Sequence, residues 1–400
     1  MRTPVVLVAG QGARVDVVDL LIQTPGSIAV SYGTDGHVVV RRVTGMRDAK
    51  TIISEWPIEL AGGCVTCTIR NDLLILLRRL HRREDVARIV VELMEWIDPE
   101  PICTAINEVP VVVGPGYIDG PASRDVEIAA VITAVDTSVW LTQALGDDDL
   151  DGSRTVAQVV VGQAAFADLL VLTGPEATTL AVLRRLAPRA RITVGLGQLE
   201  TALANLDPHA RRGSSDDPHD SLLAGQPPLK PAGEVALLEF NARRPFHPDR
   251  LHQAIDDLLD GVIRVRGRAW LASQGDAVVW IESAGGGLGV GSAGLWLAAM
   301  SDSERAYADP ERIALAASQW HEHFGDRHIA LTALVCGAAP EVITGALNRA
   351  LLTDEEMAHP ELWADYPDPF GDWHEDPCAD LPEGVSVTDE HHGTENGETL

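Results

Sequence analysis

The sequence predicts an α/β fold in which a mostly parallel sheet has helices on both faces, joined to a smaller α+β domain. Three observations support this prediction. Apolar, β-branched segments alternate with segments of helical periodicity through the first half of the chain. The strand segments are apolar at nearly every position, as in strands that are buried on both faces. A stretch rich in Pro, Gly, Ser and Asp then precedes a second group of strands and helices.

The elements of the first half follow from these patterns. The predicted strands are Val5–Ala9, Ile28–Ser31, Val38–Val40, Ile89–Leu93, Ile128–Val135, Leu169–Leu172 and Ile192–Val194. The predicted helices between them are Val15–Ile22, Asn71–Arg83, Pro101–Asn107, Val156–Ala167 and Ala177–Leu186. Ligands of such sheets bind beyond the carboxyl ends of the strands, so we expect a functional site there.

We divide the chain into a first domain over residues 1–206, a linker over 207–233, a second domain over 234–353 and an acidic tail over 354–400. The elements predicted for the second domain are Val235–Phe240, His247–Leu259, Val262–Ala272, Val278–Glu282, a glycine-rich turn region, Ile329–Cys336 and Pro340–Leu352. The chain has no lysine or arginine after Arg349, whereas acidic residues continue to Glu398. This composition predicts that the tail is partly disordered.

Charge and cysteine content narrow the classes of function. A net charge of −28 disfavours a protein whose whole surface binds nucleic acid, although a local basic patch could still contact RNA. No apolar run approaches the ~18 residues of a membrane span, and we expect no signal peptide. In a cytosolic chain, five cysteines favour reduced thiols and a metal site over a disulfide framework. We therefore expect a cytoplasmic protein that does not bind membranes.

The segment "VVLVAGQGARVDVV" has the order strand, glycine turn and helix that is typical of a phosphate-binding loop. Gly10 and Gly12 are its candidate phosphate-binding residues. The pattern G-x-x-x-x-G-K-[ST] requires a lysine after its last glycine, but Ala13 and Arg14 follow here. The rigid fork of Arg14 does not replace a compact ammonium group in a tight loop.

The segment "AGGCVTCTIRNDLL" contains the most specific motif of the chain. Cys64 and Cys67 form a C-x-x-C pair just before a predicted helix. This spacing lets two thiolates share one zinc ion, and a helix N-terminus favours the thiolate form. A tetrahedral site needs further ligands, which Cys103, a histidine or a carboxylate would have to supply. The alternative is a structural role, in which Cys64 and Cys67 are simply small, partly buried residues of a tight turn.

Arginines are concentrated in the helix that follows. Arg78, Arg79, Arg82 and Arg83 occur at i, i+1, i+4 and i+5, and we expect them to share one face while neighbouring leucines face the core. Such a face can simply be solvated. Because the chain as a whole is so acidic, a cluster of four arginines is a better candidate for a contact with RNA or with an acidic partner.

Together these segments resemble the CobW family of P-loop GTPases and metallochaperones. "GGCVTCTIRNDL" is similar to the family signature G-C-x-C-C-T-[VI]-R-x-D-L, and "RIVVELMEWIDPEPICTAI" to its Glu-Thr-Ser-Gly stretch followed by Asp-Pro. "VVGQAAFADLLVLTGPE" resembles the strand before the guanine-specificity motif, and "RRPFHPDRL" and "VIRVRGRAWLAS" resemble the C-terminal domain. The resemblance implies a P-loop-NTPase-like first domain and a CobW C-terminal-type second domain.

The chain departs from this family at the nucleotide contacts. The phosphate-loop lysine and its Ser/Thr neighbour are absent, and Thr173–Glu176 stands in place of Asn-Lys-x-Asp. Residues 93–95 replace Thr-Ser-Gly, and Thr66 replaces the middle cysteine of the metal motif. We therefore expect no efficient GTP hydrolysis and doubt that GTP is a cofactor. Zinc remains the candidate ligand of Cys64 and Cys67.

The segments "MRTPVVLVAGQ", "LLRRLHRR", "ARRPFHP" and "DPFGDWHEDPC" further resemble one actinobacterial branch of this family. That resemblance implies a factor of the zinc-starvation response that recruits a hibernation-promoting factor to ribosomes containing zinc-free ribosomal proteins. The arginine-rich helix would then contact ribosomal RNA, and the acidic C-terminal region a basic protein. The alternative is a zinc metallochaperone GTPase that delivers zinc through Cys64 and Cys67.

Overall fold

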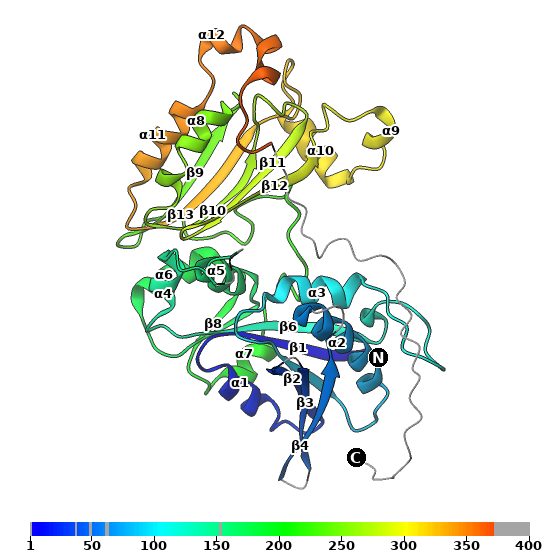
Figure 1. Ribbon diagram of the computed structural model, residues 1–400. Coiled ribbons are helices and arrows are strands. Elements are labelled where there is room, and N and C mark those ends of the chain that lie inside the picture. The colour runs from blue at the N-terminus through cyan, green and yellow to red at the C-terminus, as the bar shows by residue number, and fades with distance from the viewer. Residues whose placement is uncertain are drawn as a thin grey trace.

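The computed structural model describes residues 2–36, 38–47, 50–60, 64–150, 152 and 154–371, which form two domains (Figure 1). The first domain contains an eight-stranded sheet in the order β4-β3-β2-β5-β1-β6-β7-β8. Its strands are β1 (Thr3–Gly10), β2 (Ser27–Asp35), β3 (Val38–Arg47), β4 (Lys50–Glu59), β5 (Arg88–Glu92), β6 (Val126–Val135), β7 (Leu169–Leu172) and β8 (Arg191–Val194). Pairing is parallel from β2 to β8, and antiparallel from β2 through β3 to β4.

Helices cover both faces of this sheet. They are α1 (Arg14–Leu21), α2 (Val65–His81), α3 (Pro99–Glu108), α4 (Trp140–Leu145), α5 (Val156–Phe166), α6 (Ala177–Leu186) and α7 (Leu199–Ala204), with a short 3₁₀ turn, η2 (Ala122–Arg124). Alternate residues of β1 point to opposite faces. Val6 and Val8 pack with α1 and α7, whereas Val5 and Leu7 pack with α2 and α3. The predicted α/β fold class is therefore confirmed.

The second domain is built on an antiparallel five-stranded sheet in the order β12-β11-β10-β13-β9. Its strands are β9 (Val235–Ala242), β10 (Val262–Ala269), β11 (Ala277–Ala284), β12 (Gly287–Leu295) and β13 (Ile329–Cys336). Its helices are α8 (Pro248–Gln253), η3 (Asp256–Leu258), α9 (Asp302–Arg305), α10 (Pro310–Gln319), α11 (Pro340–Ala350), α12 (Asp354–Met357) and η4 (Pro360–Asp365). One face packs under α8 and α11, and the other packs on α4, α5 and α6 of the first domain.

Several segments differ from the sequence prediction. Strand β4 was not predicted, because it lies at the edge of the sheet and leaves Ile53 and Trp56 exposed, so it lacks an apolar pattern. Helix α2 begins before Asn71, at Val65. The glycine-rich region predicted as a turn also forms strand β12.

Residues 354–371, which we assigned to the acidic tail, lie against the second domain. Trp363 and Phe370 pack on its core, and Trp363 Nε1 donates to the Glu356 carbonyl oxygen at 2.8 Å. Arg250 holds the Glu356 carboxylate at 2.7 Å. The rest of the predicted tail, residues 372–400, lies outside the described residues.

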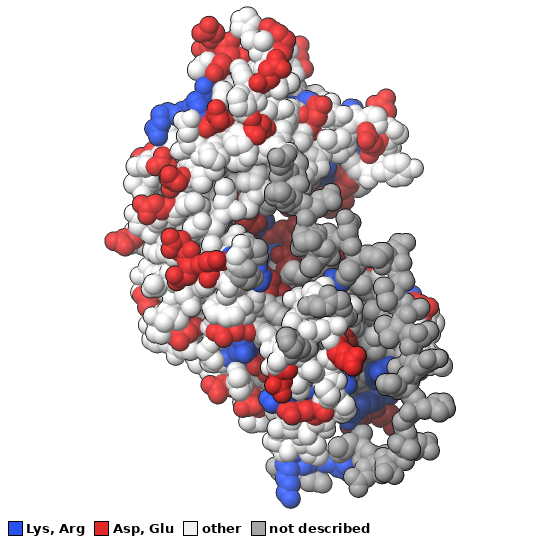
Figure 2. Space-filling model, in the orientation of Figure 1, with Lys and Arg blue, Asp and Glu red and all other residues white. Residues whose placement is uncertain are grey.

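The surface reflects the acidic composition. Figure 2 shows acidic side chains spread over both domains on the face displayed, and basic side chains in several smaller groups, one of them at the end of the first domain that bears the β3–β4 hairpin. That hairpin exposes Arg42, Arg47 and Lys50. Among the described helices, none has both the length and the hydrophobicity needed to cross a membrane.

Candidate functional site

The loop between β1 and α1 comprises only Gln11, Gly12 and Ala13. Gly10, with a φ of +98°, ends β1 so close to β6 that a Cβ atom there would overlap the carbonyl group of Ala134. The Gln11 N–H group donates to the Ala134 carbonyl oxygen at 3.1 Å. The loop is therefore held against the sheet, and its first N–H group already has an acceptor in β6.

Two buried glutamine side chains are hydrogen-bonded to each other just beyond the carboxyl end of β1. Gln11 is buried, and its Nε2 donates to Oε1 of Gln163 in α5 at 3.0 Å. Gln163 is also buried, and its Nε2 donates to the carbonyl oxygens of Glu95 and Ile97, both at 2.9 Å. This pair could not be predicted from the sequence, because Gln11 lies in the loop after β1 whereas Gln163 lies in α5, far along the chain.

Arg14, the basic residue nearest to the loop in sequence, is also engaged within the protein. Its Nε atom lies 3.1 Å from the Glu92 carboxylate at the end of β5, and its Nη1 donates to the Gly10 carbonyl oxygen at 3.1 Å. Its charge is therefore neutralised by a carboxylate. The three-residue loop is followed by no lysine, and its neighbouring arginine is paired with a carboxylate, so the described residues supply no free cation of the kind that holds nucleotide phosphates.

The segment that replaces the guanine-specificity motif has a structural role. Glu176 is the N-cap of α6, and its carboxylate accepts from the N–H groups of Thr178 at 3.1 Å and Thr179 at 2.5 Å. The hydrogen bond from Thr179, assisted by that from Thr178, lowers the pKa of this carboxyl. The carboxylate is thus used to begin a helix.

Cys64 and Cys67 lie together in the first turn of α2. Cys64 is the N-cap residue, and its Sγ accepts the Cys67 N–H group at 3.1 Å. Both side chains are partly exposed. Within the described residues, no three His, Cys, Asp or Glu side chains gather as a metal cluster. The neighbouring residues 61–63 lie outside the described ranges.

Cys103, which we considered as a third ligand, is part of the core under α2 and α3. Its side chain is fully buried, and burial raises the pKa of the thiol. A buried thiol of raised pKa is a poor metal ligand, because metal binding requires the thiolate. The structure does not bring Cys103 into a cluster with Cys64 and Cys67.

The expectation that four arginines share one exposed face is wrong for Arg78, which is 2% exposed. Its Nε lies 2.7 Å from the Asp125 carboxylate, and Nη2 donates to the Ile118 carbonyl oxygen at 2.7 Å. Its Nη1 donates to the Gly120 carbonyl oxygen at 3.2 Å. The loop after α3 covers this part of α2, and Arg78 satisfies the carbonyl groups of that loop.

The other three arginines lie nearer to solvent. Arg79 and Arg82 are exposed, and the Arg82 guanidinium lies 3.8 Å from the centre of the Tyr117 ring. Arg83 pairs with Asp85 at 2.6 Å. The basic surface on α2 is therefore Arg79 and Arg82, with Arg83 partly neutralised. That a partner binds it stays a prediction.

Comparison with known protein families matches both domains. The family described as "CobW/HypB/UreG, nucleotide-binding domain" matches residues 31–191. The family described as "Cobalamin synthesis protein cobW C-terminal domain" matches residues 235–351. The first match begins after the glycine loop, which is where the chain departs most from a nucleotide site.

Comparison with individual proteins extends this similarity. A Mycobacterium tuberculosis protein named "Zinc chaperone Rv0106" is 58% identical over 394 residues, covering 98% of this chain and 99% of its own length. The "Zinc-regulated GTPase metalloprotein activator 1" of Dictyostelium discoideum is 25% identical, covering 78% of this chain and 70% of its own. The Zn(II)-bound YjiA GTPase structure from E. coli aligns over 88% of this chain and 100% of that chain, at 14% identity and a TM-score of 0.38. Because both domain families match and a relative is 58% identical along nearly the whole chain, this protein belongs to the CobW family.

Proposed function

We propose that this protein is a zinc chaperone that carries zinc at Cys64 and Cys67 and works without GTP hydrolysis. The observation that carries the proposal is the geometry of the C-x-x-C pair. Both cysteines lie in one helical turn, and Cys64 Sγ accepts the Cys67 N–H group at 3.1 Å. A sulfur atom at a helix N-terminus is favoured as a thiolate, which is the form that binds zinc.

Two protein thiolates leave coordination positions for other ligands. Zinc prefers four ligands, so a receiving protein can add its own before the cysteines release the ion. Such an incomplete ligand set suits zinc as cargo. The Mycobacterium tuberculosis relative named as a zinc chaperone supports the same reading.

The absence of a GTP step is inferred from the glycine loop. Phosphoryl transfer depends on a lysine and backbone N–H groups that surround the phosphates. Here no lysine follows the loop, Gln11 is hydrogen-bonded to Gln163, and Arg14 is paired with Glu92. We therefore propose that zinc transfer is controlled by ligand exchange with the recipient.

Zinc titration of the reduced protein against a competing chelator tests this proposal. We expect one tightly bound zinc per chain in the wild type and none in C64S/C67S. T66A is the matched control, because Thr66 is an exposed residue between the two cysteines, and it should bind zinc like the wild type. Equal zinc binding by wild type and C64S/C67S would overturn the proposal.

A second candidate function is the recruitment of a hibernation-promoting factor to ribosomes with zinc-free ribosomal proteins. The sequence resemblance implies it, and the exposed Arg79 and Arg82 favour it because they form a basic surface on an acidic protein. Ribosomal RNA would contact this surface.

Co-sedimentation with ribosomes from zinc-limited and zinc-replete cells tests the second candidate. We expect selective binding to the zinc-limited ribosomes, its loss in R79E/R82E and its retention in the control R349E. Arg349 is an exposed arginine of the other domain, with a 71% exposed side chain. Absence of binding to either ribosome population would eliminate this candidate.

A further inference from the structure

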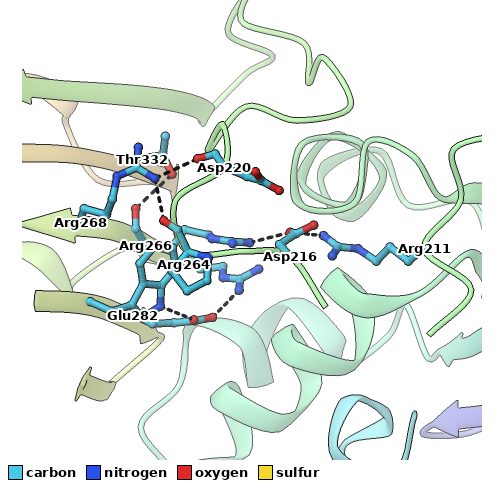
Figure 3. Close-up of polar contacts among 10 residues, drawn as sticks. Arg211, Asp216, Asp220, Arg264, Arg266, Arg268, Glu282 and Thr332 are labelled. Atoms are coloured by element: carbon cyan, nitrogen blue, oxygen red, sulfur yellow. Dashed lines mark hydrogen bonds and ion pairs between the residues drawn. The ribbon is translucent and has the colours of Figure 1, made fainter. Parts of the chain in front are cut away.

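Strand β10 places arginines at alternate positions, 264, 266 and 268. Alternate residues of a strand point to the same face, and here Val265 and Ala269 on the opposite face belong to the core of the second domain. These arginines face the segment that connects the two domains, residues 207–233, which is called the connecting segment below. Arg268 Nη1 donates to the carbonyl oxygen of Pro218 at 2.6 Å. It also donates to the carbonyl oxygen of Asp220 at 2.9 Å (Figure 3).

A cavity of about 60 Å³ lies between α6, the connecting segment and β10. Arg185 of α6, Arg211 of the connecting segment, and Arg264 and Arg266 of β10 all line it. Each of these three parts of the chain thus contributes at least one guanidinium group. The arrangement is convergent, because residues far apart in sequence bring the same charge to one small space.

The positive charges exceed the carboxylates that face them. Asp216 lines the cavity and receives Arg211 Nη2 at 2.6 Å and Arg266 Nη1 at 3.5 Å on the same oxygen atom, Oδ2. Arg264 pairs with Glu282. Asp168, a largely buried carboxylate, also interacts electrostatically with Arg211. Four guanidinium groups therefore meet three carboxylates, and the excess positive charge lies at Arg185.

Arg185 is the arginine of this cavity that most clearly lacks a counter-charge. It is 7% exposed and forms no ion pair within the part of the chain that the structure describes. Its Nη atoms donate to the carbonyl oxygens of Ala181 at 2.7 Å and Lys230 at 2.5 Å, but its Nε has no acceptor. Arg266 Nε likewise has none.

Burial affects the charge of these groups without removing it. Burial, followed by repulsion from Arg264, lowers the pKa of Arg266 to about 10, and burial lowers the pKa of Arg185. Arg266 therefore remains protonated at neutral pH. Buried charges that lack counter-charges are unfavourable, and an anion in the cavity would supply the missing charge.

We propose that this cavity binds a phosphate-type oxyanion, either free phosphate or the terminal phosphate group of a larger molecule. Planar guanidinium forks match the oxygen atoms of phosphate and hold it by charge-assisted hydrogen bonds. About 10–15 Å³ of this kind of volume holds one water molecule, so the cavity has room for several water-sized groups and hence for a compact tetrahedral anion. The bound anion would link α6 of the first domain to β10 of the second, and this inference does not depend on the proposed zinc function.

Isothermal titration of the full-length protein tests the proposal, with inorganic phosphate and ADP as separate probes at constant ionic strength in chloride. We expect saturable one-site binding to the wild type, with affinity at least tenfold weaker in R266Q. The control R349Q removes an exposed arginine that is not among the residues lining the cavity, and it should bind like the wild type.

D216N keeps the proposal falsifiable if R266Q fails to fold. Replacing Asp216 removes a carboxylate that competes with the anion for Arg211 and Arg266, so we expect several-fold tighter phosphate binding. A purely structural ion-pair network would instead lose stability without gaining affinity. Binding of both probes identifies free phosphate as sufficient, and binding of ADP alone identifies a phosphate group of a larger molecule. Absence of saturable binding of either probe, or unchanged affinity in both R266Q and D216N, would overturn the proposal.

Discussion

Replacing the buried Arg78 by methionine should destabilise the first domain, although the sequence pattern placed this residue on a binding surface. Methionine keeps much of the side-chain volume but removes the ion pair to Asp125 and the hydrogen bonds to the carbonyl groups of Ile118 and Gly120. Loss of one partner of a buried ion pair costs about 3–5 kcal/mol. Asp125 keeps 23% exposure, so water recovers part of this loss, and we expect about 3 kcal/mol.

Urea unfolding followed by circular dichroism measures this change, with R79M as the matched control. A loss of about 3 kcal/mol corresponds to a melting temperature lower by roughly 6–12 °C in a domain of this size. R79M alters an exposed residue and should stay within about 0.5 kcal/mol of the wild type. If R78M unfolds within 1 kcal/mol of the wild type, the assignment of Arg78 to a structural role is wrong.

The remaining predictions concern the zinc site, the glycine loop and the acidic segment. C103A should keep the zinc stoichiometry measured by chelator competition and lower only the unfolding free energy, because Cys103 is a core residue; loss of zinc would make it a ligand. G10A should reduce the unfolding free energy by more than the control G36A, because both glycines have positive φ but only the first abuts backbone; equal losses would contradict the close packing of the loop. The hydrogen bond from Arg250 lowers the pKa of Glu356 to about 2, so its stabilisation is complete above the unfolded pKa near 4.5 and is lost as the pH falls towards 2. Thermal unfolding of E356Q should therefore depend less on pH over this range, and an unchanged pH profile would refute the contribution of this pair.

The central strands could be predicted from the sequence because both of their faces are buried. Strands such as β5 and β7 are apolar at successive positions, since helices cover both faces of the sheet. Edge strand β4 has no such pattern, with Ile53 and Trp56 exposed. Helix α2 starts at a cysteine N-cap, which is not among the residues that usually mark a helix start.

The candidate site was only partly predictable. The absence of the lysine can be read directly from the sequence. The hydrogen bond from Gln11 to Gln163 cannot, because tertiary packing brings Gln163 to the glycine loop. Helical periodicity placed Arg78 on the arginine face because it takes no account of the loop that covers α2. The alternating arginines of β10 were visible in "VIRVRGRAWLAS", but the sequence does not show that Arg211 and Asp216 lie opposite them.

The central claim is that zinc binding at Cys64 and Cys67 is independent of GTP. The most direct measurement is the zinc affinity of the wild type, determined by chelator competition with and without saturating Mg²⁺–GTP, together with GTP turnover in the same samples. We predict one zinc per chain, the same zinc affinity in both conditions and no GTP turnover above that of the buffer without protein. A tenfold or larger change in zinc affinity with GTP, or zinc-dependent turnover, would contradict the account.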